Sequence, residues 1–442
     1  MKQADNGRII FTKQMKKDYT VLLPTMLPMH FKILEQILRT CGYKCVFLEN
    51  SGHKVVEAGL KYVHNDTCFP ALLVIGQFIS ALQSGKYDVN KTALLLTQTG
   101  GGCRASNYIP LLRKALVKAG FPQVPVISLN IVGLEKNPGF KLTLGLLKRI
   151  QYAVYYGDLL LSLRNQCRPY ELTPGATQAL CDKWVERLAE QMSHRSQLNY
   201  RTVRKTYVEI LRDFDANIPR SGEKKVRVGI VGEIFVKFSP LGNNDLEKFL
   251  VAEGAETVMA GLMDFFMYTL NASVVDTRLY GINKKKGKLM KALYNFLHKK
   301  QLEFIRLYRE NSSFTPPTDF EKTRAAIKGY IHEGVQMGEG WLLTAEMLEL
   351  IESGVRNVVC TQPFGCLPNH IVGKGMMKFI REHHPNVNLV AIDYDSSASR
   401  INQENRLKLM LANAHRLSAV PTADQRAVPA ADQRAVPAAD QQ

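Results

Sequence analysis

Residues 92–97 read Thr-Ala-Leu-Leu-Leu-Thr, a short apolar run that would be buried on both faces as a strand. Similar strand patterns stand at residues 19–24, 44–49 and 124–130. Helix patterns lie between and beside them, at residues 30–40, 54–63, 70–83 and 107–119. Such alternation predicts a parallel sheet covered by helices. We therefore expect residues 1–140 to form an α/β domain.

The alternation returns in the second half of the chain. Strand patterns stand at residues 226–233, 258–262, 355–360 and 388–393, and helix patterns at 246–252, 370–383 and 401–415. Residues 141–225 read as amphipathic helices with a break near residues 169–174, and residues 263–335 as a basic helical insertion. The sequence predicts a second α/β domain over residues 226–416 and a helical connector over 141–225.

The C-terminal tail differs in composition from the rest of the chain. From residue 419 an octamer that begins Ala-Val-Pro occurs three times, and it contains no aromatic residue. Such a segment cannot bury a core, so we expect residues 417–442 to be disordered.

Composition limits the classes of protein to which the chain could belong. The 442 residues suit two domains, and 45% of them are apolar. No apolar run reaches the roughly 18 residues that span a bilayer, and the polar N-terminus lacks a secretory signal. We expect a cytoplasmic protein with no membrane segment, in which cysteines are reduced or bind metal.

The net charge of +18 is concentrated in residues 201–227 and 284–300. These runs have two interpretations. They form an ordinary solvated surface, or they attract an acidic partner or an anionic ligand such as the phosphates of coenzyme A. They carry no motif that reads nucleic acid, so we do not expect nucleic acid as a partner.

Four of the eight cysteines stand in loops marked by glycine or proline: Cys68, Cys103, Cys360 and Cys366. Cys103 and Cys360 lie at the ends of predicted strands, where open parallel sheets gather ligands. Cys68 and Cys366 precede helices, whose N-termini favour a thiolate. Gly101 and Gly102 would let the backbone approach a bulky ligand. We predict these four thiols as metal ligands, and the remaining cysteines as small core side chains: Cys41, Cys45, Cys167 and Cys181.

The kind of metal follows less directly from the residues. The spacing matches neither a ferredoxin run nor a paired zinc knuckle. Because the ligands come from both halves of the chain, the centre would lie between two domains, which suits redox or substrate chemistry better than a structural zinc. Glu233 is a candidate general acid or base, or a loop anchor. Asn65 and Gln362 could bond around a cluster or only to their own backbone.

Three motifs resemble those of the 2-hydroxyacyl-CoA dehydratase superfamily. They are His-Asn-Asp-Thr-Cys-Phe-Pro at 64–70, Thr-Gln-Thr-Gly-Gly-Gly-Cys-Arg-Ala-Ser-Asn-Tyr at 97–108, and Gln-Pro-Phe-Gly-Cys-Leu-Pro-Asn-His at 362–370. They are most similar to the C-terminal module of CoA-activase-related, double-cubane-type proteins. Val-Gly-Glu-Ile-Phe at 231–235 and Asp-Tyr-Asp-Ser-Ser at 393–397 fit as well, and the resemblance covers roughly residues 15–412.

The resemblance implies tandem flavodoxin-like domains with an iron–sulfur cluster between them, either [4Fe-4S] or a double cubane. It also implies cluster ligation by Cys68, Cys103, Cys360 and Cys366. The expected activity is dehydration of a 2-hydroxyacyl-CoA or reduction of a small substrate. Because the chain lacks the activator's nucleotide-binding domain, a separate ATP-hydrolysing activator would supply the electrons, and we expect a dimer. The alternatives are a non-catalytic electron carrier or scaffold, and a basic binding protein with a structural zinc.

Overall fold

The computed structural model describes residues 3–419 apart from 5–6, 65, 98–102, 130–134 and 136. It contains two four-stranded sheets, both entirely parallel, with strand orders β2-β1-β3-β4 and β6-β5-β7-β8. In each sheet the second strand in sequence lies outside the first, which is the flavodoxin-like order. The predicted α/β class with two parallel sheets is therefore confirmed.

The first sheet consists of β1 (Thr20–Pro24), β2 (Lys44–Leu48), β3 (Thr92–Thr97) and β4 (Val126–Leu129). Its helices are α1 (Lys13–Asp18), α2 (Pro28–Thr40), α3 (His53–Tyr62), α4 (Phe69–Gln83) and α5 (Tyr108–Lys118). Leu94 and Leu96 of β3 pack into one apolar core, while Ala93 and Leu95 pack into another on the opposite face. The apolar run at 92–97 is thus buried on both sides, as its composition predicts.

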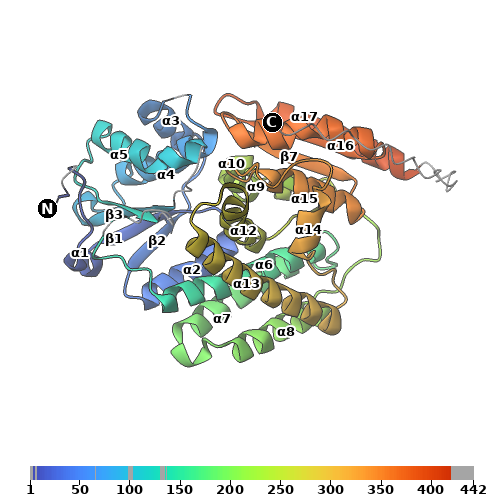
Figure 1. Cartoon of the computed structure of the whole chain (residues 1–442), viewed down its shortest axis with the longest axis horizontal. Helices are drawn as coiled ribbons and strands as arrows, with labels where there is room; N and C mark the ends of the chain where they lie inside the picture. The colour runs from blue at the N-terminus through green and yellow to red at the C-terminus, as the bar shows by residue number, and fades with distance from the viewer. Residues whose placement is uncertain are drawn as a thin grey trace.

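Three long helices follow the first sheet: α6 (Leu144–Cys167), α7 (Ala176–Ser193) and α8 (Tyr200–Asn217). In Figure 1, α7 and α8 lie below the rest of the molecule, and α6 runs between them and the second sheet. The turn between α6 and α7 falls where the sequence predicts a break. Helix α6 packs against α2, α7 and α8, and also against β6 and α12, so it contacts both halves of the chain.

The second sheet consists of β5 (Val226–Gly232), β6 (Ala255–Val258), β7 (Asn357–Pro363) and β8 (Asn388–Tyr394). Short helices α9 (Ile234–Phe238), α10 (Pro240–Asn243) and α11 (Leu246–Ala252) connect β5 to β6. The expected helical insertion contains α12 (Leu262–Tyr280), α13 (Lys284–Asn311) and α14 (Phe320–Ala326), and α15 (Trp341–Glu352) follows it. Helices α16 (Met377–His383) and α17 (Arg400–Ala419) complete this half, at the upper right of Figure 1.

Two local predictions are wrong. The strand expected at residues 258–262 lies at β6 instead, because the ladder with β5 pairs residues 255–258 and α12 begins directly afterwards. The helix expected at 370–383 is a π-helical turn (Asn369–Gly373), a 3₁₀ turn (Lys374–Met376) and then α16. The Asn369 side chain bonds to the Cys360 thiol and to the Thr361 carbonyl of β7, and the helix widens where this residue is held.

Residues of the two halves pack together in two shared apolar cores. One core combines α4 and α5 of the first half with α11 and α17 of the second. The other combines α2 and α6–α8 with the inserted helices α12 and α13. Helix α17 runs to Ala419, past the expected start of the tail, and residues 420–442 lie outside the described part of the chain. No helix in that described part has both the length and the apolarity that crossing a bilayer requires.

Candidate metal centre

A cavity of about 230 Å³ lies where strands from both sheets end. Its lining includes Pro24 and Thr97, the last residues of β1 and β3, together with Glu233 after β5 and Cys366 after β7. Parallel sheets collect ligands at their carboxyl edges, next to the point where the strand order reverses. In this chain two such edges contribute to one space. Three cysteines line the cavity: Cys68, Cys103 and Cys366.

Cys68 is held at the start of α4. It is the residue that precedes the first turn, its side chain is buried, and its Sγ lies 3.4 Å from the Tyr108 hydroxyl. The next residue, Phe69, donates its backbone N–H to the carbonyl of Phe364 at 3.1 Å. The Cys68 loop of the first half is therefore bonded directly to the Cys366 turn of the second half.

Cys366 follows a glycine that the fold requires. Gly365 has φ of +72°, and a Cβ added to it would lie 3.2 Å from the Cα of Cys68. Only glycine combines this left-handed backbone with so close an approach at no steric cost. Cys103 precedes the 3₁₀ turn Arg104–Asn107, and its Sγ accepts the Ala105 N–H at 3.3 Å. These contacts bring three chain segments together around the cavity.

Burial decides the protonation of these thiols in the bare protein. It raises the pKa of Cys68 to about 11 and that of Cys366 further still. Desolvation thus opposes the thiolate that a helix N-terminus would favour at Cys68. A metal would have to replace these protons, as metal centres generally do when they bind cysteine.

Two carboxyls accompany the thiols. Glu233 precedes α9 and accepts the Val236 N–H at 2.9 Å, and Glu339 accepts the Ile234 N–H at 3.0 Å. Both line the cavity and both are buried. Burial and the neighbouring Glu339 raise the pKa of Glu233 to about 8, and burial also raises the pKa of Glu339. Glu233 therefore anchors its loop, and its role as a general acid or base stays a prediction.

Sequence reasoning missed Glu339 and Tyr108. Glu339 lies between Gly338 and Gly340, which both have positive φ. A Cβ on Gly338 would lie 3.9 Å from the Cys103 Sγ, so this loop of the second half approaches the first closely. The sequence Gly-Glu-Gly at residues 338–340 is the feature from which Glu339 could have been identified. Tyr108 ends the 97–108 motif, but its hydroxyl could be placed beside Cys68 only by the fold.

Cys360 is separate from the other three cysteines. Its thiol donates to Asn369 Oδ1 at 3.2 Å, and its side chain is fully buried in an apolar cluster with residues of α15 and α16. Cys360 does not belong to the described lining of the cavity. Gln362 does not line it either, since its amide bonds to the His370 ring at 2.7 Å.

The remaining predicted site residues are Asn65, Gly101 and Gly102, which lie outside the described residues. Of the cysteines expected to be structural, Cys45, Cys167 and Cys181 are buried in the apolar core, and Cys41 is half-buried at its edge. Within the described ranges, no three Cys, His, Asp or Glu side chains are grouped so that they could hold one metal ion. Cys68, Cys103 and Cys366 instead line the same cavity.

Comparison with known proteins returned no match, since no family model and no curated protein aligns with this chain. The likeness to 2-hydroxyacyl-CoA dehydratases therefore stays a prediction that depends on the motifs.

Proposed function

We propose that the chain is an iron–sulfur protein that holds a cysteine-ligated cluster between its two sheets and uses it for low-potential one-electron chemistry. One observation carries this proposal: Cys68, Cys103 and Cys366, from both halves of the chain, line the same cavity. Cysteine thiolates are the usual ligands of iron–sulfur clusters. The cavity also meets the requirement for a partly enclosed site at the carboxyl edges of the sheets.

The donor set fits such a cluster. Cys68 and Cys366 are buried among apolar side chains, and the low dielectric around a cluster is one of the means by which a protein sets its potential. When bound, the cluster would supply one electron at a time, and three protein ligands would leave one iron of a cubane open to substrate. A [4Fe-4S] cluster and a double cubane are both compatible with this proposal, and Cys360 remains the candidate for a fourth ligand.

Glu233 and Glu339 would donate and accept protons at this site. Because the pKa of Glu233 is raised to about 8, this carboxyl can keep a proton near neutral pH and release it into the cavity. Burial shifts the pKa of Glu339 in the same direction. Such a group suits the two reactions that we propose, dehydration of a 2-hydroxyacyl-CoA and reduction of a small substrate, since both must move protons together with electrons. Tyr108, whose hydroxyl contacts Cys68, would hold that ligand in place.

An external electron donor has a surface on which it could dock. Phe364, Leu367 and Ile371 are 52%, 45% and 56% exposed, and they flank Cys366 in sequence. Large apolar side chains exposed together commonly mark a protein interface. We propose that the separate ATP-hydrolysing activator docks here, next to the cluster.

The test is anaerobic reconstitution with iron and sulfide, followed by iron and acid-labile sulfide analysis and electron paramagnetic resonance of the reduced protein. Wild type should bind about four irons per chain, or about twice that for a double cubane. Cys103→Ala and Cys366→Ala should lose most of this iron. Cys181→Ala is the matched control, because it removes a buried thiol far from the cavity and should keep the iron.

The same experiment separates the alternatives. Cys360→Ala should keep the iron if three cysteines suffice, and should lose it if Cys360 is a fourth ligand. Equal iron loss in Cys103→Ala and Cys181→Ala would contradict the proposed site. A protein that binds the cluster and exchanges electrons with an activator, but turns over no 2-hydroxyacyl-CoA, would be an electron carrier.

A further inference from the structure

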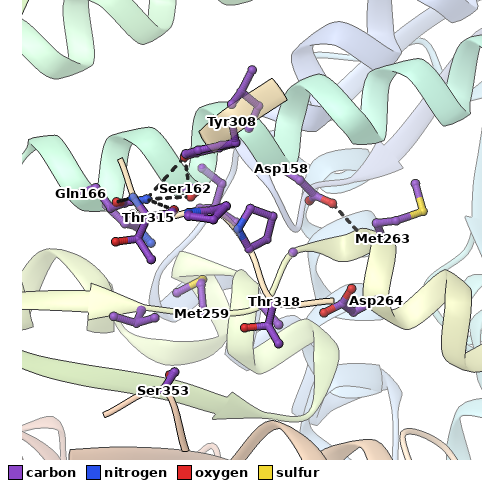
Figure 2. Close-up of a pocket in the computed structure, with 18 of the residues that line it drawn as sticks. Asp158, Ser162, Gln166, Met259, Met263, Asp264, Tyr308, Thr315, Thr318 and Ser353 are labelled. Atoms are coloured by element: carbon purple, nitrogen blue, oxygen red, sulfur yellow. Dashed lines mark hydrogen bonds between the residues drawn. The ribbon is translucent and has the colours of Figure 1, made fainter. Parts of the chain in front are cut away.

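A second cavity, of about 200 Å³, lies beside the edge strand β6 and is shown in Figure 2. Its walls come from α6, the β6–α12 connection, α13, residues 315–318 and α15. None of its described lining residues lines the cysteine cavity. It opens to solvent near Thr315 and Ser353, which are exposed. A site here would be independent of the proposed cluster.

The lining of this cavity is rich in acid. One guanidinium, that of Arg227, faces five carboxyls, which are Asp158, Glu256, Asp264, Glu346 and Glu349. A carboxylate taken out of water is costly unless a cation or hydrogen-bond donors compensate it. The question is therefore which of these acids already have such partners.

Three of the five carboxyls, those of Asp158, Glu346 and Glu256, already have a cation or several hydrogen-bond donors of the chain as partners. Asp158 accepts the backbone N–H groups of Leu262 and Met263 at 2.8 and 2.9 Å and lies 2.9 Å from the His30 ring. The Glu346 carboxylate is paired with Lys237 Nζ at 2.8 Å. The contact of Asp158 with the start of α12 is visible in Figure 2.

Glu256 is compensated in the same way. It accepts the Tyr170 hydroxyl at 2.7 Å and lies 3.5 Å from Arg227 Nε. Arg227, the one cation of the lining, is thus already engaged.

Asp264 and Glu349 form no ion pair with any of the described residues. Asp264 accepts one hydrogen bond, from the Gln301 amide at 3.0 Å, and Glu349 accepts the Thr318 hydroxyl. Burial raises the pKa of both carboxyls, and the charge of Glu346 adds to the shift at each. The charge of Lys237 acts against this shift at both carboxyls, but Lys237 is already paired with Glu346, so one ammonium group of the chain serves three neighbouring acids.

Two further oxygen atoms of the lining have no hydrogen-bond partner in the described part of the chain. Thr257 Oγ1 and Asn165 Oδ1 belong to side chains that are 1% and 5% exposed. Buried polar atoms in folded proteins are almost always hydrogen-bonded. Each of these two oxygens is therefore available to accept a hydrogen bond from a ligand. All four groups (Asp264, Glu349, Thr257 and Asn165) can accept hydrogen bonds.

We propose that this cavity binds a small organic cation with a primary ammonium group, held by the carboxylates of Asp264 and Glu349 and by the free oxygens of Thr257 and Asn165. An ammonium group carries one positive charge and three donors, which matches acceptors that lack partners. At roughly 30 Å³ for each water in the liquid, the cavity has room for only about six or seven waters, so the ligand is small.

The experiment is isothermal titration calorimetry on the full chain with methylammonium, 1,2-diaminoethane or 1,4-diaminobutane as the probe. Sodium and potassium chloride at matched ionic strength serve as references. At least one amine should bind saturably, and its affinity should rise with pH, because burial raises the pKa of both acids and the cation binds their ionised forms. Asp264→Asn and Glu349→Gln should each weaken binding by about tenfold or more.

Glu310→Gln is the matched control, since Glu310 is an exposed acid on α13 whose charge lies outside the cavity lining. Its affinity should equal that of wild type. Thr257→Val, which removes only the hydroxyl, should weaken binding without changing the pH dependence. If no amine binds better than the two salts, water alone occupies the cavity and the proposal fails. Equal affinities in Asp264→Asn and Glu310→Gln would also overturn it.

Discussion

Replacing Glu346 by glutamine would remove the carboxylate that is directly bonded to the buried ammonium group of Lys237. The two side chains are only 7% and 4% exposed, and Lys237 Nζ lies 2.8 and 2.9 Å from the two carboxylate oxygens. Lys237 is on α9, one turn after Glu233, and Glu346 is on α15, which begins just after Glu339. This ion pair therefore fixes the two helices that follow the acids of the cysteine cavity.

The cost of the substitution can be bounded from the geometry. Two unit charges 4 Å apart attract by about 4 kcal/mol at an effective dielectric constant of about 20, and this pair is closer. In the intact pair, desolvation offsets much of that attraction. The Glu346→Gln variant keeps the desolvation cost of Lys237 and loses the attraction, so we expect a loss of about 3–5 kcal/mol of stability. Lys237→Met with Glu346→Leu removes both charges at similar volume and should be close to wild type.

The chain offers a local probe for this measurement. It has two tryptophans, and Trp341, which is fully buried, is the first residue of α15. In a Trp184→Phe background, urea unfolding followed by fluorescence reports on the helix that carries Glu346. The single variants, the double variant and the parent are compared in this background, which gives a double-mutant cycle.

A loss below about 1 kcal/mol in Glu346→Gln would refute this reasoning, because such a value is typical of an exposed ion pair. A double variant as unstable as the single one would refute it as well, since the loss would then come from packing and not from an isolated charge.

The other predictions concern the cysteine cavity and the core. Gly365→Ala should lose about 1–3 kcal/mol in urea unfolding and reduce iron binding, because alanine disfavours φ of +72° and its Cβ would approach Cys68; unchanged iron would contradict this. Since the folded protein keeps a proton on Glu233 up to about pH 8 while the unfolded chain releases it near 4.5, stability should fall as pH rises between these values. Glu233→Gln should flatten this dependence, and an identical slope in the variant would count against the assignment. Cys181→Ser should cost about 1–3 kcal/mol without loss of iron, because it places a hydroxyl in the apolar core; a neutral effect would argue against that burial.

The fold was predictable where a pattern is local. The run at 92–97 specified a strand buried on both faces, and the helix expected at 246–252 is found with the same bounds as α11. The predictions failed where tertiary contacts set the bounds. Pairing with β5 places β6 three residues earlier than its apolar run suggests, and the contact of Asn369 with β7 turns the expected helix into a π turn.

The site was predictable to a similar extent. Loop position identified Cys68, Cys103 and Cys366, which share a cavity, but it gave Cys360 the same weight. Alternation along β7 turns the Cys360 side chain into the core with α15 and α16. The face of a strand toward which a residue points depends on register and on the packed layers, which the spacing of cysteines does not contain.

The order of apolar and polar residues along the chain determined two parallel sheets and the loops that hold the three cavity thiols, because strand and helix periodicity depend on near neighbours. Which thiols meet, and which acids meet them, depended on groups far apart in the chain. Tertiary packing within the second half placed Glu339 beside Glu233, and packing of the two halves drew Gly365 against Cys68. The free energy that fixes these contacts comes from burying surfaces that are far apart in the sequence.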